Sequence, residues 1–245
     1  MKNSLNKSQI ERFSRQLILK KIGAKGQKKI LSSKILVIGI GGLGCPAAEN
    51  LVRAGIGTIG LVDNDIVNLS NIHRQSLFNS EDIKKTKVSV AAKKLKKINP
   101  LTKIKTYKSR LNEKNVEKII KDYDLIIDGS DNFKTKFLIN DCCIKWKKKL
   151  VTGAISKFDG HIFTFDFKDK NTASLKNFYQ ENEVSDDILN CEFEGVLGTT
   201  ATIVGATQAN EALKMLMEIG QNLKNQILII DLLNLNFRKV KFNKK

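Results

Sequence analysis

The sequence predicts an α/β fold built on a doubly wound, mostly parallel β-sheet that ends in antiparallel C-terminal strands. Apolar runs of strand length alternate with stretches of helical period up to about residue 155, which is typical of repeated βαβ units. Beyond Ala154 the spacing changes to the alternation of antiparallel strands. A glycine-rich turn also follows the first apolar run, where a fold of this class binds its ligand.

The elements expected before residue 155 follow one another regularly. A helical arm is predicted over about residues 1–32. Strands and helices then alternate over about residues 33–155, in the order KILVIG, LGCPAAENLVRAG, TIGLVD, SEDIKKTKVSVAAKKLKKI, KIKTYKS, EKNVEKIIKD, YDLIIDG, FKTKFLINDCCIKWKK and LVTGA. We expect these strands to pair in parallel, because a helix joins each strand to the next.

The remaining sequence predicts the antiparallel end of the sheet. KFDGHIFTFDF indicates an antiparallel strand pair, GTTATIVGATQANEALKMLMEIG a helix, and NQILIIDLL with FRKVKF the closing strands. The polar stretch between them predicts a long mobile loop over about residues 168–190, since structureless segments of that length are usually functional or disordered. No internal repeat or low-complexity linker interrupts the sequence, so we expect one domain over residues 1–245.

Composition narrows the class of protein. No apolar run approaches the roughly 20 residues that a membrane span needs, and the opening residues lack an apolar signal segment, so a soluble cytoplasmic protein is expected. The cysteines form no CxxC pair and predict neither a disulfide framework nor a zinc site; they are Cys45, Cys142, Cys143 and Cys191.

The net charge of +18 leaves three interpretations open. Lysines spread through KKTKVSVAAKKLKKINP and IKWKKKL fit solvated faces and a compositional drift toward Lys, Asn and Ile. The same positive field would attract nucleic-acid phosphates or an acidic protein partner.

A G-x-G-x-x-G turn predicts a nucleotide site on a Rossmann-like sheet. Gly39, Gly41 and Gly44 lie between a predicted strand and a predicted helix, and Asp63 ends the next strand about 20 residues on. Glycines let the backbone approach a phosphate, the helix N-terminus offers unpaired N–H groups, and Asp63 can accept hydrogen bonds from ribose hydroxyls. The motif does not by itself distinguish NAD from other nucleotides.

Polar residues past the second strand favour a nucleotide with a triphosphate. DNDIVNLSNIHRQ places Asp65, Asn68, Asn71, Arg74 and Gln75 at the carboxyl edge of the sheet. The Arg74 guanidinium suits a bidentate phosphate contact, and Lys87, near the start of the next helix, suits a point charge on a phosphate oxygen. Each would be a surface charge if it stood alone.

The fourth strand ends in a further polar group, DGSDN, which contains Asp128, Ser130, Asp131 and Asn132. A carboxylate beside bound phosphates is a suitable ligand for Mg²⁺, which proteins usually hold through one or two carboxylates plus phosphate oxygens. Asp131 has an equally good alternative as the N-cap of the helix that SDNFKTKF begins.

At these residues the sequence resembles the activating-enzyme superfamily, specifically the bacterial MoeB/ThiF/HesA adenylyltransferases that activate ubiquitin-like sulfur-carrier proteins. The matching stretches occur in the family's order over nearly the whole chain: RFSRQLIL, VIGIGGLGCPAAENLVRAGIG, LVDNDIVNLSNIHRQSLF, KVSVAAKKLKKINP, DLIIDGSDNFKTKFLIND, LVTGAISKFDGHIFTF and CEFEGVLGTTATIVGATQANEALKML. The resemblance implies that the C-terminal Gly-Gly carboxylate of a small carrier attacks the α-phosphorus of ATP, giving an acyl-adenylate and pyrophosphate. It leaves the molybdopterin and thiamine pathways open.

The resemblance also implies a role for each matching residue. Asp63 corresponds to the ribose ligand, Arg74 and Lys87 to the triphosphate clamp with Asn71 assisting, and Asp131 to the magnesium ligand. The phosphate turn corresponds to Gly39, Gly41, Gly42 and Gly44. Arg15 resembles an arginine supplied to the ATP of the neighbouring subunit, which implies a homodimer; its alternative is a plain surface arginine.

Cys191 and the missing zinc ligands mark where the resemblance is weaker. Cys191 aligns with a cysteine proposed in some members to carry the acyl group or a persulfide, but its acidic neighbours disfavour a thiolate, and it fits a packing role as well. Many members carry two CxxC pairs that this sequence lacks, so no zinc is expected and the order of the 168–190 loop is left open.

Three other functions compete with carrier adenylation. A related branch dehydrates a threonylcarbamoyl group on tRNA with ATP, and the positive charge keeps that alternative open. An NAD-dependent oxidoreductase accounts for the glycines and Asp63 but gives Arg15, Arg74, Lys87 and Asp131 no role. A non-catalytic interaction module would not need Lys87 or Asp131.

Overall fold

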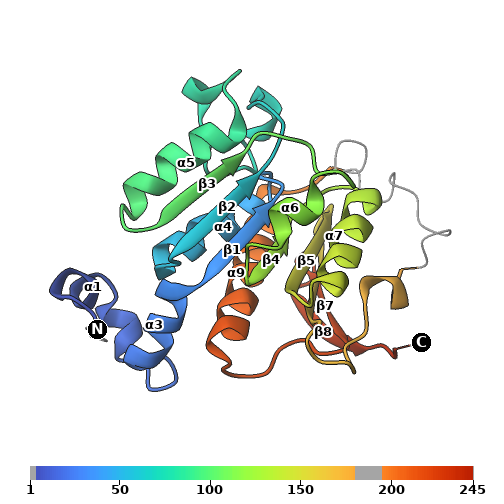
Figure 1. The fold of residues 1–245 in the computed structure, drawn as a ribbon. Helices are drawn as coiled ribbons and strands as arrows, with labels where there is room; N and C mark the ends of the chain where they lie inside the picture. The colour runs from blue at the N-terminus through green and yellow to red at the C-terminus, as the bar shows by residue number, and fades with distance from the viewer. Residues whose placement is uncertain (1–3, 180–194, 245) are drawn as a thin grey trace.

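In the described part of the chain, the protein forms a single eight-stranded sheet with helices on both of its faces (Figure 1). The computed structural model describes residues 4–179 and 195–244. The strand order across the sheet is β3-β2-β1-β4-β5-β6-β7-β8. The strands are β1 (Lys34–Ile38), β2 (Thr58–Val62), β3 (Lys103–Tyr107), β4 (Leu125–Asp128), β5 (Lys149–Ser156), β6 (Asp159–Asp166), β7 (Gln226–Asp231) and β8 (Asn236–Lys241).

The sheet has a parallel half and an antiparallel half, as predicted. β3, β2, β1, β4 and β5 pair in parallel, and β5 to β8 pair antiparallel. The register places the last residues of β1, β2 and β4 level with one another, because Ile38 lies beside both Val62 and Asp128. The loops that follow these strands therefore leave the sheet at one common edge.

Alternate side chains of the central strands enter two different cores. On β1, Ile35 and Val37 belong to the core beneath α4 (Gly44–Ala54), α5 (Lys87–Ile98) and α9 (Gly198–Met217). Leu36 and Ile38 belong to the core beneath α6 (Val116–Ile120) and α7 (Phe133–Lys145). Burial on both faces explains why these strands are continuous apolar runs in the sequence.

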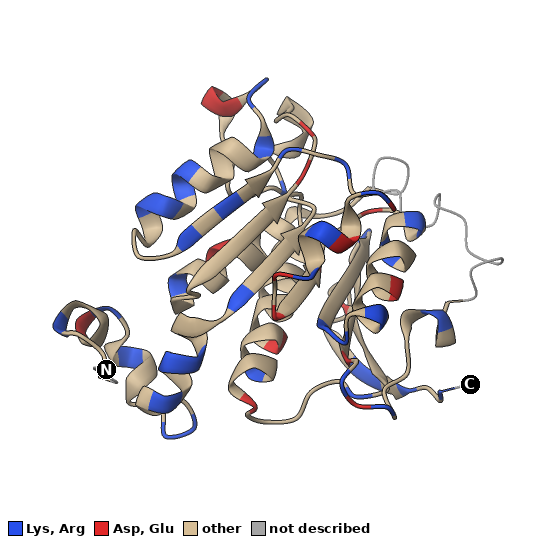
Figure 2. Cartoon of the chain, viewed as in Figure 1, with Lys and Arg blue, Asp and Glu red and all other residues tan. Residues whose placement is uncertain are grey.

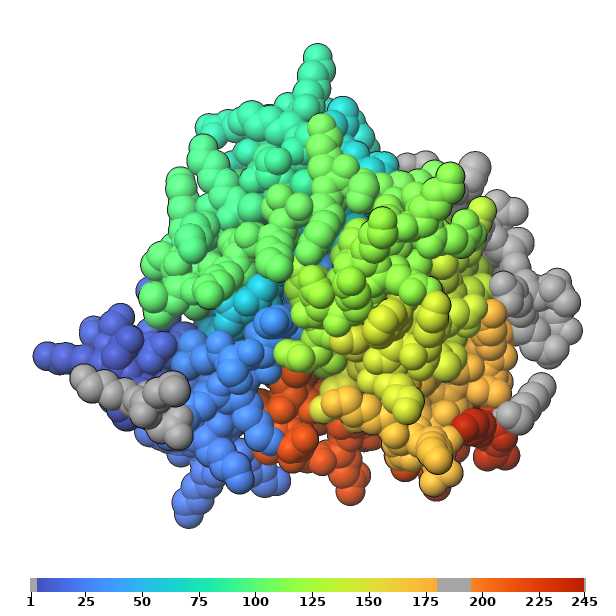
Figure 3. Space-filling model, viewed as in Figure 1, coloured from blue at the N-terminus to red at the C-terminus, as the bar shows by residue number. Residues whose placement is uncertain are grey.

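The N-terminal arm consists of α1 (Lys7–Arg12), α2 (Ser14–Leu17) and α3 (Gly23–Ser32). It projects from the body of the molecule (Figure 3). The Phe13 ring is buried against Gly55, and Arg12 Nη1 donates to the Ile98 carbonyl at 3.0 Å. The short helices α1 and α2 are thus attached to the body mainly through Phe13, while the apolar residues Ile18 and Leu19, which follow α2, stay exposed.

In the described part of the predicted loop, residues 168–179, several side chains are buried. A 3₁₀ helix, η3 (Leu175–Asn177), follows the buried residue Ala173. Leu175 N–H donates to Asn140 Oδ1 at 3.1 Å, and Ala173 N–H donates to Asn225 Oδ1 at 2.8 Å. Side-chain amides from distant segments stabilise these turns, a contribution that local polarity does not reveal. The remainder of the predicted loop, 180–190, lies outside the described residues.

Two further 3₁₀ helices, η1 (Leu69–Asn71) and η2 (Ser80–Asp82), connect β2 to α5. The prediction had placed a helix over all of SEDIKKTKVSVAAKKLKKI, whereas the α-helix begins only at Lys87. Asn79 caps the 3₁₀ turn by accepting the Glu81 N–H at 3.1 Å. Among helices in the described ranges, none is both long and apolar enough to cross a membrane.

Candidate functional site

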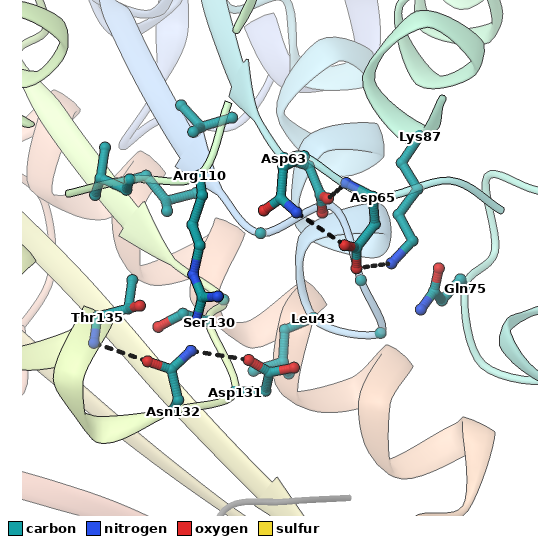
Figure 4. A pocket seen from close by; sticks show the side chains of 18 of the residues that line it. Leu43, Asp63, Asp65, Gln75, Lys87, Arg110, Ser130, Asp131, Asn132 and Thr135 are labelled. Atoms are coloured by element: carbon teal, nitrogen blue, oxygen red, sulfur yellow. Dashed lines mark hydrogen bonds and ion pairs between the residues drawn. The ribbon is translucent and has the colours of Figure 1, made fainter. Parts of the chain in front are cut away.

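A cavity of about 380 Å³ opens at the carboxyl edge of the parallel strands. It lies where the strand order reverses between β1 and β4, the position at which open α/β sheets bind ligands. The turn after β1, the η1 region after β2, the loop after β3 and the start of α7 all contribute to its wall. Figure 4 shows acidic, basic and amide side chains converging there.

Two glycines of the turn after β1 are required by packing of the protein itself. Gly39 has φ +81°, and a Cβ there would lie 2.7 Å from the Gly129 carbonyl oxygen. A Cβ at Gly44 would lie 1.8 Å from the Gly39 carbonyl oxygen. Both contacts are shorter than atoms tolerate, so these glycines allow the turn to form against the end of β4.

Gly41 differs, because no protein atom crowds the place its side chain would take. The nearest atom to a Cβ at Gly41 is Gln75 Nε2 at 3.8 Å, which is ordinary contact. Gly41 and Gly42 line the cavity, whereas a Cβ at Gly42 would meet Ala201 Cβ at 3.1 Å. The open space at Gly41 therefore fits a ligand that approaches the backbone closely, as a phosphate does at such turns.

Asp63 is held in the cavity by two backbone donors. Its Oδ2 accepts the Ile40 N–H at 2.7 Å and its Oδ1 accepts the Asp65 N–H at 2.8 Å. Burial raises the pKa of Asp63, while the Lys87 ammonium and these backbone donors oppose the rise. Each carboxylate oxygen keeps a second acceptor direction, so the fixed side chain can still accept from a ribose hydroxyl.

Lys87 is the first residue of α5 and extends into the same cavity. Its Nζ lies 3.0 Å from Asp65 Oδ2, and its side chain is 8% exposed whereas that of Asp65 is 58% exposed. The pair therefore joins a buried cation to a solvated carboxylate. A phosphate oxygen can replace Asp65 as the partner of Lys87 at small cost, because exposed carboxylates contribute little to an ion pair.

Arg74 and Asn71 line the cavity from the segment after β2. Arg74 Nη1 donates to the Ser70 carbonyl at 2.8 Å and lies 2.8 Å from His73 Nε2. Asn71 is buried, and its Oδ1 accepts the Asn68 N–H at 3.1 Å. The loop thus fixes both side chains while the amide of Asn71 and the remaining guanidinium donors of Arg74 stay available to a ligand.

Asp131 is not the N-cap of α7, which rules out the alternative role considered for it. The N-cap is Asn132, whose Oδ1 accepts the Thr135 N–H at 2.9 Å. Asp131 is exposed at the cavity wall, and within the described residues its Oδ1 accepts from Asn132 Nδ2 at 3.1 Å. Its carboxylate therefore keeps acceptor capacity for a cation.

The described ranges 4–179 and 195–244 contain no group of three or more His, Cys, Asp or Glu side chains arranged to hold a metal ion. A site for Mg²⁺ does not require such a group, because phosphate oxygens and water supply most of its ligands in nucleotide sites. The residues present fit Mg²⁺ only as a companion of a phosphate ligand at Asp131.

A buried ion pair supports the floor of the cavity. Asp128 Oδ2 accepts from Lys136 Nζ at 3.1 Å, and the same ammonium donates to the Gly153 carbonyl at 2.7 Å. Asp128 Oδ1 accepts from both the backbone N–H and the hydroxyl of Ser130. These bonds join β4, β5 and α7 and fix the turn that carries Asp131.

Sequence reasoning missed Arg110, Thr135 and Lys136, all of which line the cavity. Arg110 could have been found by the rule that identified Asp63 and Asp131, since it closely follows β3 at the same edge. Thr135 and Lys136 lie within α7, and only the position of that helix brings them to the site.

Arg15 and Cys191 are not among the described residues that line this cavity. Arg15 is exposed on α2 and does not line the cavity of its own chain as far as the described residues define it. Cys191 lies outside the described residues. Burial raises the pKa of Cys45 to about 12 and that of Cys142 to about 11, and it also raises the pKa of Cys143. These three thiols are buried and pack in the two cores of the protein.

Comparison with known proteins identifies relatives over nearly the whole chain. The sequence model of the ThiF family matches residues 13–245. The sulfur carrier protein adenylyltransferase of Thermus thermophilus is 38% identical over 237 residues, which cover 96% of this chain and 88% of that protein. A probable molybdopterin-synthase adenylyltransferase of Gracilaria tenuistipitata is 37% identical, with 98% of this chain and 66% of that protein covered.

Longer relatives and solved structures also match most of this chain. The adenylyltransferase and sulfurtransferase MOCS3 of Drosophila virilis is 38% identical over 99% of this chain, which spans 53% of that protein. The structure of E. coli MccB with ATP has a TM-score of 0.84 at 21% identity, covering 96% of this chain and 71% of that one. PaaA has a TM-score of 0.83 at 20% identity, covering 100% and 77%. The structures of MccB and PaaA therefore share the fold of this chain.

Proposed function

This chain belongs to the ThiF family, and on that basis we propose that it adenylates a small sulfur-carrier protein at its C-terminal glycine. The carrier's carboxylate oxygen attacks the α-phosphorus of ATP, the bond from that phosphorus to the bridging oxygen breaks, and pyrophosphate leaves. The product is an acyl-adenylate. No proton transfer is needed at neutral pH, because the carboxylate is already ionised.

The observation that carries the proposal is the arrangement of one cavity. A glycine turn with open space at Gly41, a ribose acceptor at Asp63 and a buried cation at Lys87 line the same 380 Å³. These three features together fit a nucleotide that carries several phosphates. The relatives named for sulfur carriers and molybdopterin synthase support the choice of carrier.

Binding and orientation come from residues fixed before the nucleotide enters. Asp63 accepts from the ribose, and the backbone at Gly41 with the first turn of α4 donates to phosphate oxygens. Arg74 and Asn71 hold the phosphates from the opposite loop. Because these groups are already ordered, the α-phosphorus is presented to the carboxylate with little further loss of entropy.

Lys87 is proposed to stabilise the charge that develops during attack. Its ammonium leaves Asp65 for a nonbridging oxygen of the α-phosphate, where negative charge accumulates as the fifth bond forms. The low exposure of Lys87 strengthens this interaction, since water screens it less than it screens a surface cation.

Mg²⁺ is proposed to bind beside Asp131, with phosphate oxygens and water as its other ligands. When bound, this cation neutralises phosphate charge and favours departure of pyrophosphate. The chain's own part is to hold the Asp131 carboxylate at the turn that Asp128 and Ser130 fix.

Arg15 is proposed to act on the ATP of a second copy of this chain, so the active enzyme is a homodimer. Its exposure on the projecting arm, away from the cavity of its own chain, supports action across an interface. A guanidinium delivered in this way would lower the charge of the triphosphate. We place the reaction in the cytoplasm, where ATP is present and thiols such as Cys45 stay reduced.

Exchange of labelled pyrophosphate into ATP tests the proposed function. Purified protein is incubated with ATP, Mg²⁺ and labelled pyrophosphate, together with each of several small carriers that end in Gly-Gly. Label should enter ATP only with an accepted carrier, and a form of that carrier lacking its last glycine should give none. Exchange that is independent of any carrier would overturn the proposal.

The same assay addresses Cys191 and the tRNA alternative. Cys191→Ser should leave pyrophosphate exchange intact, and a loss of later sulfur transfer alone would assign it a covalent role after adenylation. A parallel reaction receives bulk tRNA in place of a carrier. ATP hydrolysis stimulated by tRNA, with no exchange for any carrier, would favour the tRNA-modifying branch.

A further inference from the structure

Arg110 is fixed at the rim of the cavity by its own backbone. The loop after β3 places it there, and the Arg110 carbonyl accepts from Asn115 Nδ2 at 2.9 Å. Asn115 Oδ1 in turn accepts the Asn112 N–H at 2.9 Å. The next residue, Leu111, is buried in the core with Val116. The main chain that follows Arg110 is thus held in place while the Arg110 side chain is exposed to the cavity.

The guanidinium of Arg110 is uncommitted. Within the described ranges, the hydrogen bonds of Arg110 involve its carbonyl oxygen, and no ion pair or hydrogen bond engages its side chain. In Figure 4 the side chain extends into the cavity from the loop after β3. An exposed arginine on a fixed backbone, directed into a pocket without a protein partner, is available to a ligand.

Apolar residues line the wall near Arg110. Ile38, Val62 and Leu111 line the cavity and belong to one core cluster. Ile38 and Val62 are neighbours at the ends of β1 and β2, and Asp63 follows Val62 directly. The ribose acceptor therefore lies next to a small apolar surface that can receive a flat ring.

The order of groups across the cavity matches the order of groups in a nucleotide. In the view of Figure 4, Asp63 lies between Arg110 on one side and Lys87 on the other. In ATP the ribose likewise lies between the base and the phosphates. If Asp63 holds the ribose and Lys87 the α-phosphate, the base lies on the side of Arg110.

We propose that Arg110 holds the adenine base of ATP, with its guanidinium plane stacked on one face of the ring and the apolar wall of Ile38, Val62 and Leu111 against the other. A planar guanidinium stacks on aromatic faces, whereas the compact ammonium of lysine does so less well. This assignment rests on the proposed function, since it takes ATP as the ligand. It gives the base a specific contact besides those of the ribose and phosphates.

The test separates base binding from phosphate binding. AMP, tripolyphosphate and ATP are each titrated against the wild-type protein and the variants Arg110→Ala, Arg110→Lys and Lys108→Ala. Lys108 is a matched control, because it is an exposed cation two residues away that is not among the cavity residues of the described chain. Circular dichroism of each variant verifies folding, which an exposed side chain should not disturb.

Arg110→Ala should weaken binding of AMP and ATP about tenfold and leave binding of tripolyphosphate within about twofold. Arg110→Lys should lose most of the same affinity although the charge is kept, and Lys108→Ala should change none of the three. Equal losses for AMP and tripolyphosphate, or full rescue by lysine, would overturn the stacking role. If the wild-type protein binds no ATP at all, the proposed function fails first and separately.

Discussion

Lys87 is the residue whose replacement tests the chemistry most sharply. Lys87→Ala removes the buried cation proposed to stabilise charge at the α-phosphate, so carrier-dependent pyrophosphate exchange should fall by about 10²–10³-fold. The fold should survive, because the partner left behind, Asp65, is an exposed carboxylate. Lys85→Ala, which removes an exposed cation of the same segment, should retain near wild-type exchange. Comparable losses of pyrophosphate exchange in both variants would mean that Lys87 contributes only general positive charge.

Asp63 predicts how ATP binding depends on pH. Its pKa is raised in the folded protein, chiefly by burial, so it takes up a proton at a higher pH than an ordinary carboxyl. A protonated carboxyl is a poorer acceptor for ribose hydroxyls, so ATP affinity should fall as the pH drops through this raised pKa. In the absence of ATP, the stability of the fold depends on pH in the opposite direction. Protonated Asp63 favours the folded state, and this contribution to stability is lost as the pH rises through the pKa of the folded protein.

Titrations of ATP binding between neutral and acidic pH would measure this effect. Asp63→Asn should bind ATP more weakly at pH 7 and lose the part of the pH dependence that belongs to Asp63. The protonation of the phosphates themselves is common to both proteins and cancels in the comparison. Identical pH profiles for the two proteins would show that Asp63 does not contact the nucleotide.

At the scale of single residues, the sequence predicts the acceptors and cations of the site but not their partners. Asp63, Asn71, Arg74, Lys87 and Asp131 all line one cavity, because strand ends can be recognised from apolar runs. The Lys87–Asp65 pair and the choice of Asn132 over Asp131 as N-cap depend on side-chain directions that spacing does not fix. Whether each residue has its proposed role stays a prediction.

Among the structural elements, the turn between β1 and α4 needs glycine for two different reasons, which the sequence motif does not distinguish. One reason is close packing within the protein, and the other is the approach of a ligand to the backbone. Gly44→Ala should prevent stable folding, since its Cβ would overlap the Gly39 carbonyl oxygen at 1.8 Å. Gly41→Ala should fold with wild-type thermal stability, because its Cβ would meet only Gln75 Nε2 at 3.8 Å, yet bind ATP at least tenfold more weakly. Thermal unfolding and ATP titration of the two variants check both outcomes. If the Gly41→Ala variant folds and its ATP affinity is unchanged, no phosphate binds at this turn.

The accuracy of the predicted elements follows from how each is stabilised. The buried parallel strands were identified because both faces are apolar. KFDGHIFTFDF was expected to form a strand pair, but it supplies the single strand β6, which pairs antiparallel with β5 and β7. Over residues 168–179, Asn140 and Asn225, far away in the sequence, accept hydrogen bonds from the backbone, and the mobility expected of this segment stays a prediction. The start of α5 was placed too early, because polar 3₁₀ turns and helix starts share the same residue types.

For the whole molecule, the sign and distribution of charge affect how it meets other molecules, at surfaces outside the site. Figure 2 shows Lys and Arg along α5, β3 and the N-terminal arm, with fewer acidic residues between them. On β3, the outermost strand of the sheet, Lys103 and Lys105 are exposed and discourage pairing with another sheet edge. The net charge of +18 would also increase the rate of encounter with an acidic carrier at low salt.

The proposed dimer predicts that two inactive variants restore each other. Arg15→Ala and Lys87→Ala should each be nearly inactive alone. After mixing with exchange of subunits, each hybrid dimer contains one complete site, which has Lys87 from one chain and Arg15 from the other. Random exchange should recover about a quarter of wild-type pyrophosphate exchange. No recovery, with hybrid dimers verified by differential tagging, would mean that Arg15 does not act across an interface.

The central claim is that the carrier's terminal carboxylate receives the adenylyl group, and transfer of label to the carrier tests it most directly. An accepted Gly-Gly carrier is incubated with the protein, Mg²⁺ and ATP radiolabelled at either the α- or the γ-phosphate, and the acid-quenched carrier is then isolated. Label should appear on the carrier from the α-position only, should be released by hydroxylamine and should be absent with Lys87→Ala. A carrier that stays unlabelled while ATP is consumed, or that acquires label from the γ-position, would contradict it.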